Sequence, residues 1–191
     1  MSMILEGIVT TLNGDRTPNI APMGPIVDES MQRLRLRPFN TSQTYRNLAR
    51  QGHGVFHVVD DVLLLARAAI GRWETLPETV PAAQIDGRVI SSACRWYEFV
   101  VEELDDSQER SDILARVVHR DRIRDFFGFN RAKHAVLEAA ILATRMQILP
   151  YDEIQRQLRE LQSPIEKTAG PAETEAFELL TCYIAEHAPV S

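Results

Sequence analysis

The stretch Arg33-Leu34-Arg35-Leu36-Arg37-Pro38-Phe39-Asn40-Thr41-Ser42-Gln43-Thr44 changes its hydrophobic period partway along. Two leucines alternate with three arginines, which predicts a strand with one buried face and one arginine face. The polar residues that follow predict a helix over residues 41–51, capped by Asn40 or Thr41. Gly52 suits the end of that helix. This succession indicates a chain that is mainly β with additional α structure.

The segments before this stretch are also typical of strands. Residues 3–12 are rich in β-favouring types, although Gly7 weakens the run. Asn13-Gly14-Asp15 predicts a hairpin, because Asn and Gly tolerate positive φ. The returning residues 18–27 contain three prolines, which cannot donate to a ladder. We therefore expect an interrupted or edge strand there.

The rest of the chain divides into a β part and a helical part. Strands are expected over residues 55–59, 89–104 and 113–123, a short helix over 62–70, and a loop over 76–86. Composition turns alanine-rich after about Gly128, and helices are expected over 130–148, from about 151 to 167, and from 171 to about 186. We expect two domains: a β domain over residues 1–127 and a three-helix region over residues 128–191, packed on it.

Composition and charge exclude several classes of protein. The 191 residues carry a net charge of −6, which argues against a general nucleic-acid binder or a polybasic membrane-surface protein. No basic leader and no membrane-spanning apolar run is visible. Two cysteines cannot form a disulfide framework or a four-thiolate metal site. We expect a cytoplasmic protein without a bound metal.

The usual catalytic motifs are missing. The five histidines show no metal-ligand spacing, and no nucleophile elbow, Walker loop or G-x-G-x-x-G occurs. One group of residues is suited to binding phosphate. Arg37 ends the arginine face, and hydroxyls at Thr41, Ser42 and Thr44 lie in the first turn of the expected helix. The alternative is an ordinary helix cap beside a solvated arginine face.

The proline-containing segment could complement such a site. Asn19-Ile20-Ala21-Pro22-Met23-Gly24 is a bent backbone with small residues and few donors, and its free polar groups could read the edge of a flat heterocycle. The alternative is an irregular edge strand.

Taken in order, these motifs resemble a known superfamily. Asn19-Ile20-Ala21-Pro22-Met23-Gly24, Arg37-Pro38-Phe39 and Thr41-x-x-Thr44-Tyr45-x-Asn47-Leu48 are similar to the FMN-binding split-barrel proteins, which include flavin reductases and pyridoxamine-phosphate oxidases. The similarity is greatest to an uncharacterised branch in which Gly128-Phe129-Asn130-Arg131-Ala132-Lys133-His134-Ala135 opens a C-terminal helical region. It covers residues 5–145, approximately.

The resemblance implies a fold and a set of binding residues. The fold is a closed antiparallel split barrel that forms a homodimer with FMN near the interface. Cofactor-binding residues implied for the ring are Asn19, Ala21, Pro22, Met23 and Gly24. Those implied for the phosphate are Arg37, Thr41 and Thr44.

A second set opens the C-terminal region. Asn130, Arg131, Lys133 and His134 lie close to a helix N-terminus, where cations oppose the helix dipole. An anionic substrate group or a second subunit could compensate. The alternative is a set of ordinary ionic contacts within the chain.

The resemblance suggests a flavin-dependent oxidoreductase. FMN would relay a hydride or electrons from NADH or NADPH to a small acceptor, for which a heterocycle is one candidate, with no dedicated side-chain nucleophile. No catalytic residue is assigned. The alternative is a non-catalytic FMN-binding or interaction module.

Overall fold

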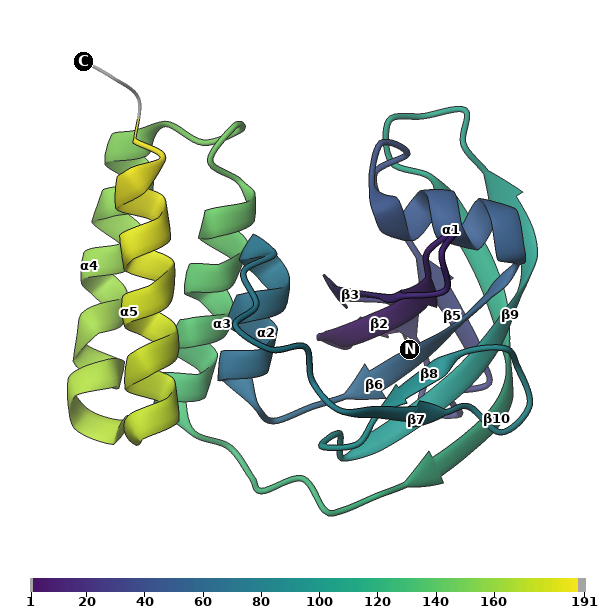
Figure 1. Cartoon of the computed structure of the whole chain (residues 1–191). Coiled ribbons are helices and arrows are strands. Elements are labelled where there is room, and N and C mark those ends of the chain that lie inside the picture. Colours follow the sequence, from purple (N-terminus) through teal and green to yellow (C-terminus); the bar gives the residue numbers. More distant parts are fainter. Residues whose placement is uncertain (1, 189–191) are drawn as a thin grey trace. The chain divides into compact units, whose positions relative to one another are not determined.

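The computed structural model describes residues 2–188, which contain two sheets and five helices (Figure 1). Internal contacts divide the chain into two compact units. The barrel unit comprises the chain up to Val59 together with Leu76–Phe126. The helical unit comprises Asp60–Thr75 together with the chain from Phe127 onward. Residues 60–75, which we had counted with the β domain, therefore group with the helices.

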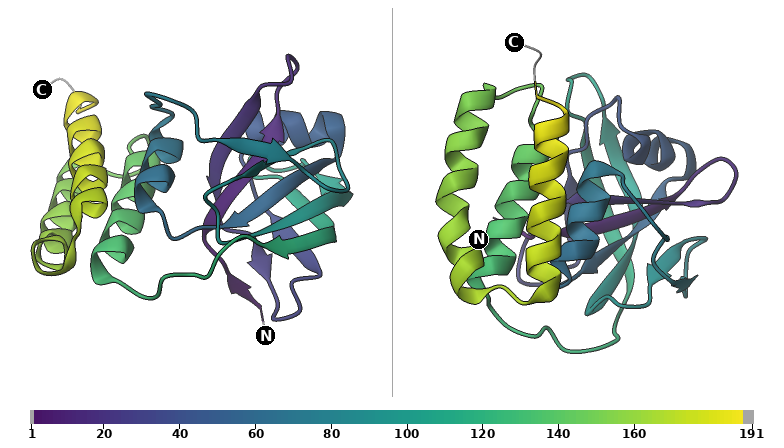
Figure 2. Two further views of the ribbon diagram at one scale, coloured as in Figure 1. Left: turned by 60° about the horizontal axis from the view of Figure 1, so that its bottom comes forward. Right: turned by 60° about the vertical axis from the view of Figure 1, so that its left-hand side comes forward.

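The barrel unit is built on one antiparallel sheet with the strand order β1-β4-β5-β10-β9-β6-β2-β3. It curls into a split barrel, as expected (Figures 1 and 2). Its strands are β1 (Met3–Ile4), β2 (Gly7–Leu12), β3 (Pro18–Met23), β4 (Ile26–Val27), β5 (Arg33–Leu36), β6 (His53–Val58), β9 (Arg95–Asp105) and β10 (Asp112–Arg122). Both edges of the sheet, β1 and β3, come from the N-terminal 23 residues.

The expected first strand is divided in two. The chain leaves β1 at Leu5, whose N–H donates to the Pro25 carbonyl at 3.1 Å, and re-enters the sheet at Gly7. A Cβ at Gly7 would lie 2.3 Å from the His57 carbonyl oxygen, so only glycine permits this close approach. The following hairpin is confirmed, but its positive φ of 69° falls on Arg16 and not on Asn13 or Gly14.

The alternation in β5 is confirmed, and the following helix begins slightly later than expected. Leu34 and Leu36 are fully buried. Helix α1 (Gln43–Gln51) is capped by Ser42, whose hydroxyl accepts from the Tyr45 N–H, and not by Asn40 or Thr41. Gly52 ends the helix at a φ of 70°, as expected. Consecutive hydroxyl and amide residues all have cap propensity, so local sequence could not choose among them.

A small hairpin lies where a loop and the start of a long strand were expected. β7 (Thr79–Pro81) pairs with β8 (Arg88–Ile90), and a turn separates β8 from β9. β8 packs against β2 and β6. The hairpin therefore covers part of the large sheet.

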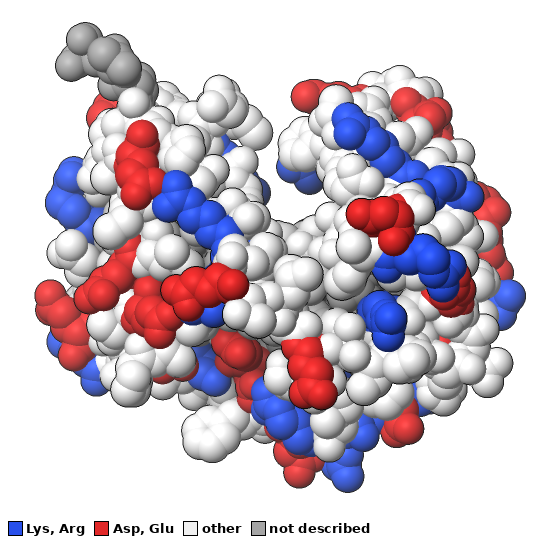
Figure 3. Space-filling model, viewed as in Figure 1, with Lys and Arg blue, Asp and Glu red and all other residues white. Residues whose placement is uncertain are grey.

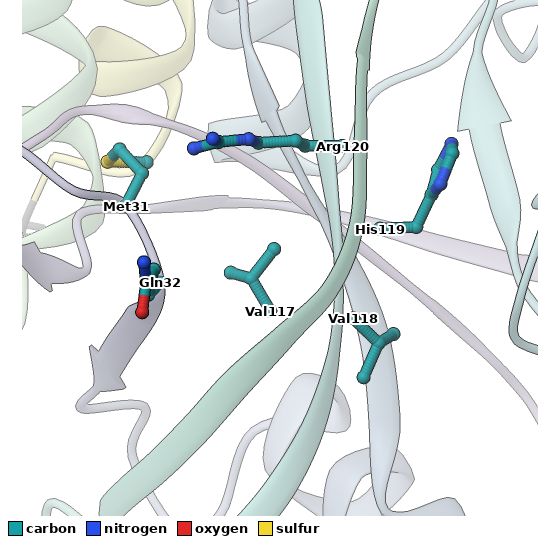
Figure 4. Close-up of a pocket in the computed structure, with 6 residues that line it drawn as sticks. All are labelled: Met31, Gln32, Val117, Val118, His119 and Arg120. Carbon is teal, nitrogen blue, oxygen red and sulfur yellow. The ribbon is translucent and has the colours of Figure 1, made fainter.

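A bulge changes which residues of β10 share a face. Val117 lies opposite Phe99 and His119 lies opposite Glu98, which leaves Val118 as the extra residue. Strict alternation along the expected strand over residues 113–123 would instead place Val117 and His119 on one face. Figure 4 shows Val117 and Arg120 on one side of β10 and His119 on the other.

The helical unit has a core of its own. It contains α2 (Val62–Ile70), α3 (Arg131–Thr144), α4 (Tyr151–Thr168) and α5 (Pro171–Glu186), and α3 contacts the other three (Figure 2). The bounds of α2 match the expected ones, whereas α3 ends before residue 148. Fully buried positions include Val136, Leu180 and Ile184. None of the described helices is long and apolar enough to cross a membrane.

Candidate functional site

The edge strand β3 carries most of the residues that the sequence predicts for cofactor binding. It pairs only with β2, in register from Thr11 opposite Asn19 to Gly7 opposite Met23. Pro18 and Pro22 have no N–H, so at an edge they fit positions whose N–H would face away from β2. The outer edge of β3 therefore offers mainly carbonyl acceptors. Ala21, Pro22 and Met23 are each partly exposed along it.

Gly24 follows β3 and is partly exposed. A Cβ there would lie 2.7 Å from Ile4 Cγ2 and 2.9 Å from either carboxylate oxygen of Glu6. Both contacts are with side chains of exposed residues, which can move aside. Local packing therefore does not by itself require glycine at this position.

Asn19 is tied to helix α1 by its side chain. Its amide nitrogen donates to the Thr11 hydroxyl and to the Thr44 hydroxyl, each at 3.1 Å. Thr11 and Thr44 are 2% and 3% exposed, whereas Asn19 is partly exposed. Two predicted site residues, Asn19 and Thr44, are therefore in direct contact.

The arginine face of β5 is mostly paired. Arg33 lies 3.8 Å from Glu102, and Arg35 Nε donates to Asp112 at 2.6 Å. Arg37 is exposed and has no ion pair within 4.0 Å in the described part of the chain, although its charge helps to lower the pKa of Asp112. Arg37 is thus the member of the series whose guanidinium is available to a ligand.

The turn between Arg37 and α1 is fixed to the β9–β10 turn. The Ser111 hydroxyl donates to the Pro38 carbonyl at 2.9 Å, and the Asn40 N–H donates to the Glu109 carbonyl at 3.0 Å. Thr41 is exposed and lies directly before the Ser42 cap. Arg37 and Thr41 therefore stand on a constrained segment next to a helix N-terminus, where unpaired N–H groups favour anions.

The second predicted set lies in the helical unit, and part of it has structural partners. Asn130 caps α3 and also donates to the Thr168 carbonyl at 3.0 Å. Lys133 Nζ donates to the Asp60 carbonyl at 2.7 Å and lies 3.9 Å from Glu173.

The other two members of this set are more accessible. His134 Nε2 lies 3.9 Å from Glu138, and its side chain is 72% exposed. Arg131 is also exposed. The charge of Lys133 is thus compensated within the unit, while Arg131 and His134 remain accessible.

Two surface hollows are lined by other residues. One of about 360 Å³ is lined by Met31, Gln32, Val117, Val118, His119 and Arg120 (Figure 4), and one of about 520 Å³ by Arg35, Glu103, Leu104, Asp105, Asp112 and Leu114. In Figure 4, His119 points away from Met31 and Gln32. Neither hollow includes a residue of the predicted cofactor set.

A buried polar cluster beneath the β7–β8 hairpin was missed by sequence reasoning. Glu98 is fully buried and accepts hydrogen bonds from the N–H groups of Ala83, Gln84 and Ile85 at 2.7, 2.7 and 3.2 Å. Burial opposes ionisation, but these donors and the Trp96 indole outweigh it and lower the pKa of Glu98 below its usual value. The signal was faint: one acidic residue among apolar ones in a predicted strand.

His57 belongs to the same cluster. Its Nε2 accepts from the Ile90 N–H at 3.1 Å, so its other nitrogen carries the proton and faces the Ile8 carbonyl at 3.2 Å. Burial lowers the pKa of His57 to about 4. Both polar groups are fully partnered, so the cluster anchors the hairpin.

Two other chemistries have little to build on in the described residues. No group of three or more His, Cys, Asp or Glu side chains is placed to hold a metal ion. Of the two cysteines, Cys94 is buried and Cys182 is exposed. On the face shown in Figure 3, acidic and basic side chains are interspersed.

A curled antiparallel sheet with a proline-blunted edge strand and a helix following β5 defines a split barrel of the flavin reductase type. Family models carry the assignment further. A family model described as the N-terminal domain of a protein of unknown function (DUF447) matches residues 5–124. A second model, described as a protein of unknown function (DUF447), matches residues 130–181. The chain belongs to the DUF447 family.

Solved structures agree with this assignment. An FMN-bound family member from Methanosarcina mazei is 26% identical, with a TM-score of 0.80 over 94% of each chain. The 2-nitrobenzoate 2-nitroreductase of Pseudomonas fluorescens shares the fold at 20% identity and a TM-score of 0.51, over 61% of this chain and 64% of the other. Flavoredoxin of Desulfovibrio vulgaris also shares the fold, at 14% identity and a TM-score of 0.54, over 62% of this chain and 69% of the other. No curated protein matches the chain.

Proposed function

We propose that this protein binds FMN in its split-barrel unit and uses it as a flavin-dependent oxidoreductase. The observation that carries the proposal is the FMN-bound family member, which is similar over 94% of both chains. The names of the fold neighbours, a nitroreductase and a flavoredoxin among them, support redox chemistry with a flavin.

The residues present fit the two ends of FMN. The phosphate is a dianion, and Arg37 is an exposed guanidinium without an ion-pair partner among the described residues. Thr41 and the N-terminus of α1 add donors nearby. The isoalloxazine ring is flat, and the exposed outer edge of β3 from Asn19 to Met23 is a suitable surface for it.

When bound, the flavin would supply the redox chemistry, and the protein would bind and orient it. No side-chain nucleophile is needed, in keeping with the sequence, which contains no nucleophile motif. One of the fold neighbours is an NADH:FAD oxidoreductase of Streptomyces globisporus. We therefore propose NADH or NADPH as the electron donor and a small organic molecule as the acceptor.

The first experiment is the visible absorption spectrum of the purified protein, with mass analysis of any chromophore released on denaturation. A flavin spectrum and released FMN would support the proposal. A colourless protein that also fails to take up added FMN would overturn it. Bound FMN that NADH and NADPH cannot reduce would instead indicate a non-catalytic binding module.

Replacing Arg37 by alanine should weaken FMN binding about tenfold to a hundredfold, because a charge-assisted hydrogen bond contributes about 1.5–3 kcal/mol. The salt dependence of the affinity should also decrease. Fluorescence titration at two salt concentrations measures both. Arg33→Ala is the matched control, since Arg33 lies on the same face and is paired with Glu102 at 3.8 Å. Equal dissociation constants for wild type and Arg37→Ala would remove Arg37 from the site.

We also propose a homodimer. The proposal rests on the superfamily resemblance and on large apolar side chains that are exposed, among them Ile4 and Phe127, which are 62% and 89% exposed. Sedimentation at micromolar concentration should give twice the monomer mass. A monomer that still binds FMN tightly would contradict this prediction.

Of the predicted contacts to a substrate or a second subunit at the start of α3, we propose only the two accessible residues. Arg131 and His134 are exposed and can meet a substrate or a second subunit. Asn130 and Lys133 are left out of the proposal, because their side chains already donate to the Thr168 and Asp60 carbonyls.

A further inference from the structure

A buried hydrogen-bond network connects α1 to the β2–β3 hairpin and ends at Asn19. Asn47, 2% exposed, donates to the Thr11 hydroxyl at 3.0 Å and to Asn13 Oδ1 at 3.0 Å. Thr11 also accepts from Asn19, which in turn donates to Thr44. Buried polar groups are costly unless they are hydrogen-bonded, and a satisfied network holds each of its side chains in one orientation.

The orientation of the Asn47 carboxamide is fixed by its neighbours. Arg50 can only donate, and its Nη2 lies 3.3 Å from Asn47 Oδ1 and also bonds the Leu12 carbonyl. Gln43 donates to the same oxygen of Asn47 at 2.9 Å. The amide nitrogen of Asn47 must therefore face Thr11, which leaves the Thr11 hydroxyl oxygen as the acceptor.

The Asn19 carboxamide is likewise oriented with its nitrogen toward the network. Both amide protons of Asn19 are used on hydroxyls, one on Thr11 and one on Thr44. Asn19 is partly exposed and lies on the edge strand, whereas Thr11, Thr44 and Asn47 are buried. What it offers to a ligand is its carbonyl oxygen, a hydrogen-bond acceptor.

We propose that Thr11, Thr44 and Asn47 are positioning residues that hold the Asn19 carboxamide with its oxygen free to accept a hydrogen bond from the bound flavin. This inference rests on the proposed function. It gives Thr44 a different task from holding the phosphate: Thr44 is 3% exposed and acts through Asn19. The flavin groups that donate are the ring N–H and the ribityl hydroxyls, which FMN shares with riboflavin.

The test is a double-mutant cycle of Thr44→Val and Asn19→Ala, with dissociation constants measured for FMN and for riboflavin. Each single variant should weaken both ligands by about the same factor, roughly fivefold to tenfold, as expected for one neutral hydrogen bond. In the Asn19→Ala background, Thr44→Val should have no further effect on affinity. Thr44→Ser, which keeps the hydroxyl, should restore wild-type affinity.

Matched controls separate positioning from general damage. Thr10→Val removes another buried threonine hydroxyl of β2, one that donates to the Arg88 carbonyl and does not touch the network. It should leave both dissociation constants unchanged. Thr11→Val repeats the cycle with a strand residue, in case Thr44→Val does not fold.

The outcomes distinguish the inference from the proposed function. If Thr44→Val weakens FMN but not riboflavin, or if its effect adds to that of Asn19→Ala, Thr44 contacts the ligand directly and the inference is overturned. If wild type binds neither flavin, the proposed function fails and the inference fails with it.

Discussion

Replacing Glu98 by glutamine is expected to lower the free energy of unfolding of the barrel unit by about 3 kcal/mol. Each carboxylate oxygen accepts two donors: Oε1 from Ala83 N and Trp96 Nε1, and Oε2 from Gln84 N and Ile85 N. In glutamine one of these oxygens becomes an NH₂ group, which then faces two donors and satisfies neither. Urea denaturation of both proteins measures the difference.

The structure offers a matched control on the same loop. Asp86→Asn is also a carboxylate-to-carboxamide change, but Asp86 pairs with Arg16 at the surface, where the two side chains are 58% and 71% exposed. Such pairs contribute about 1 kcal/mol or less. If Glu98→Gln costs no more than Asp86→Asn, the buried carboxylate does not anchor the hairpin.

Unfolding must be followed in the barrel unit alone, since two compact units need not unfold together. The chain has two tryptophans, Trp73 in the helical unit and Trp96 in the barrel unit. A Trp73→Phe background makes Trp96 fluorescence the probe. Proteolysis within residues 79–90 should also become faster in Glu98→Gln if the hairpin detaches first.

Local sequence was sufficient for elements whose signals lie within them. The leucine and arginine alternation predicted β5, and the three prolines predicted an edge position for β3. Val62–Ile70 was bounded correctly because Gly71 adopts the left-handed conformation that ends the helix, with a φ of 66°. Each of these signals acts over a few residues, so no tertiary information was needed.

The errors arose where distant segments decide the local structure. β1 and β2 are separate strands because β1 pairs with β4, whereas β2 pairs with β3 and β6. The bulge at Val118 depends on the pairing of β10 with β9. β7 is three residues long, and its pairing with β8 is what makes it a strand.

The same reasoning applies to the candidate site. Arg37, Asn19 and Thr44 could be selected as candidate binding residues from residue type and order. Their burial and their pairing with other side chains could not be predicted in this way. Only the structure shows that Arg33 and Arg35 are paired while Arg37 is not, and that Thr44 is buried against Asn19. Thr11 had no signal of its own, and Asn47 appeared only as a member of a motif. Their hydrogen bonds could not be predicted, because a polar network is defined by contacts between helix and sheet.

Acidification is expected to destabilise the barrel unit through His57, in a pH range above that of its carboxylates. His57 has a pKa of about 4 in the folded protein, against 6.5 for an ordinary histidine. Between these values the unfolded chain binds a proton that the folded chain does not. The free energy of unfolding must therefore fall as pH falls from 6.5 toward 4. The complete loss amounts to about 3 kcal/mol, at about 1.4 kcal/mol per pH unit.

The expected result is a sloping stability profile over this range for wild type and a flatter one for His57→Gln. Glutamine can still accept from the Ile90 N–H but takes up no proton. Glu98 does not contribute here, because a carboxyl with a lowered pKa keeps its stabilisation until pH falls below its unfolded value of 4.5.

A second variant shows whether the pH dependence comes from His57 in particular. His134→Gln removes an exposed histidine of the helical unit, 72% exposed at its side chain, and should leave the slope of the Trp96 unfolding profile unchanged. Urea titrations at pH 7, 6, 5 and 4.5 define each profile. If wild type and His57→Gln lose stability in parallel over this range, then the folded protein accommodates a charged His57. The hydrogen bond from the Ile90 N–H would then have to yield on protonation, and the hairpin would not depend on a neutral imidazole.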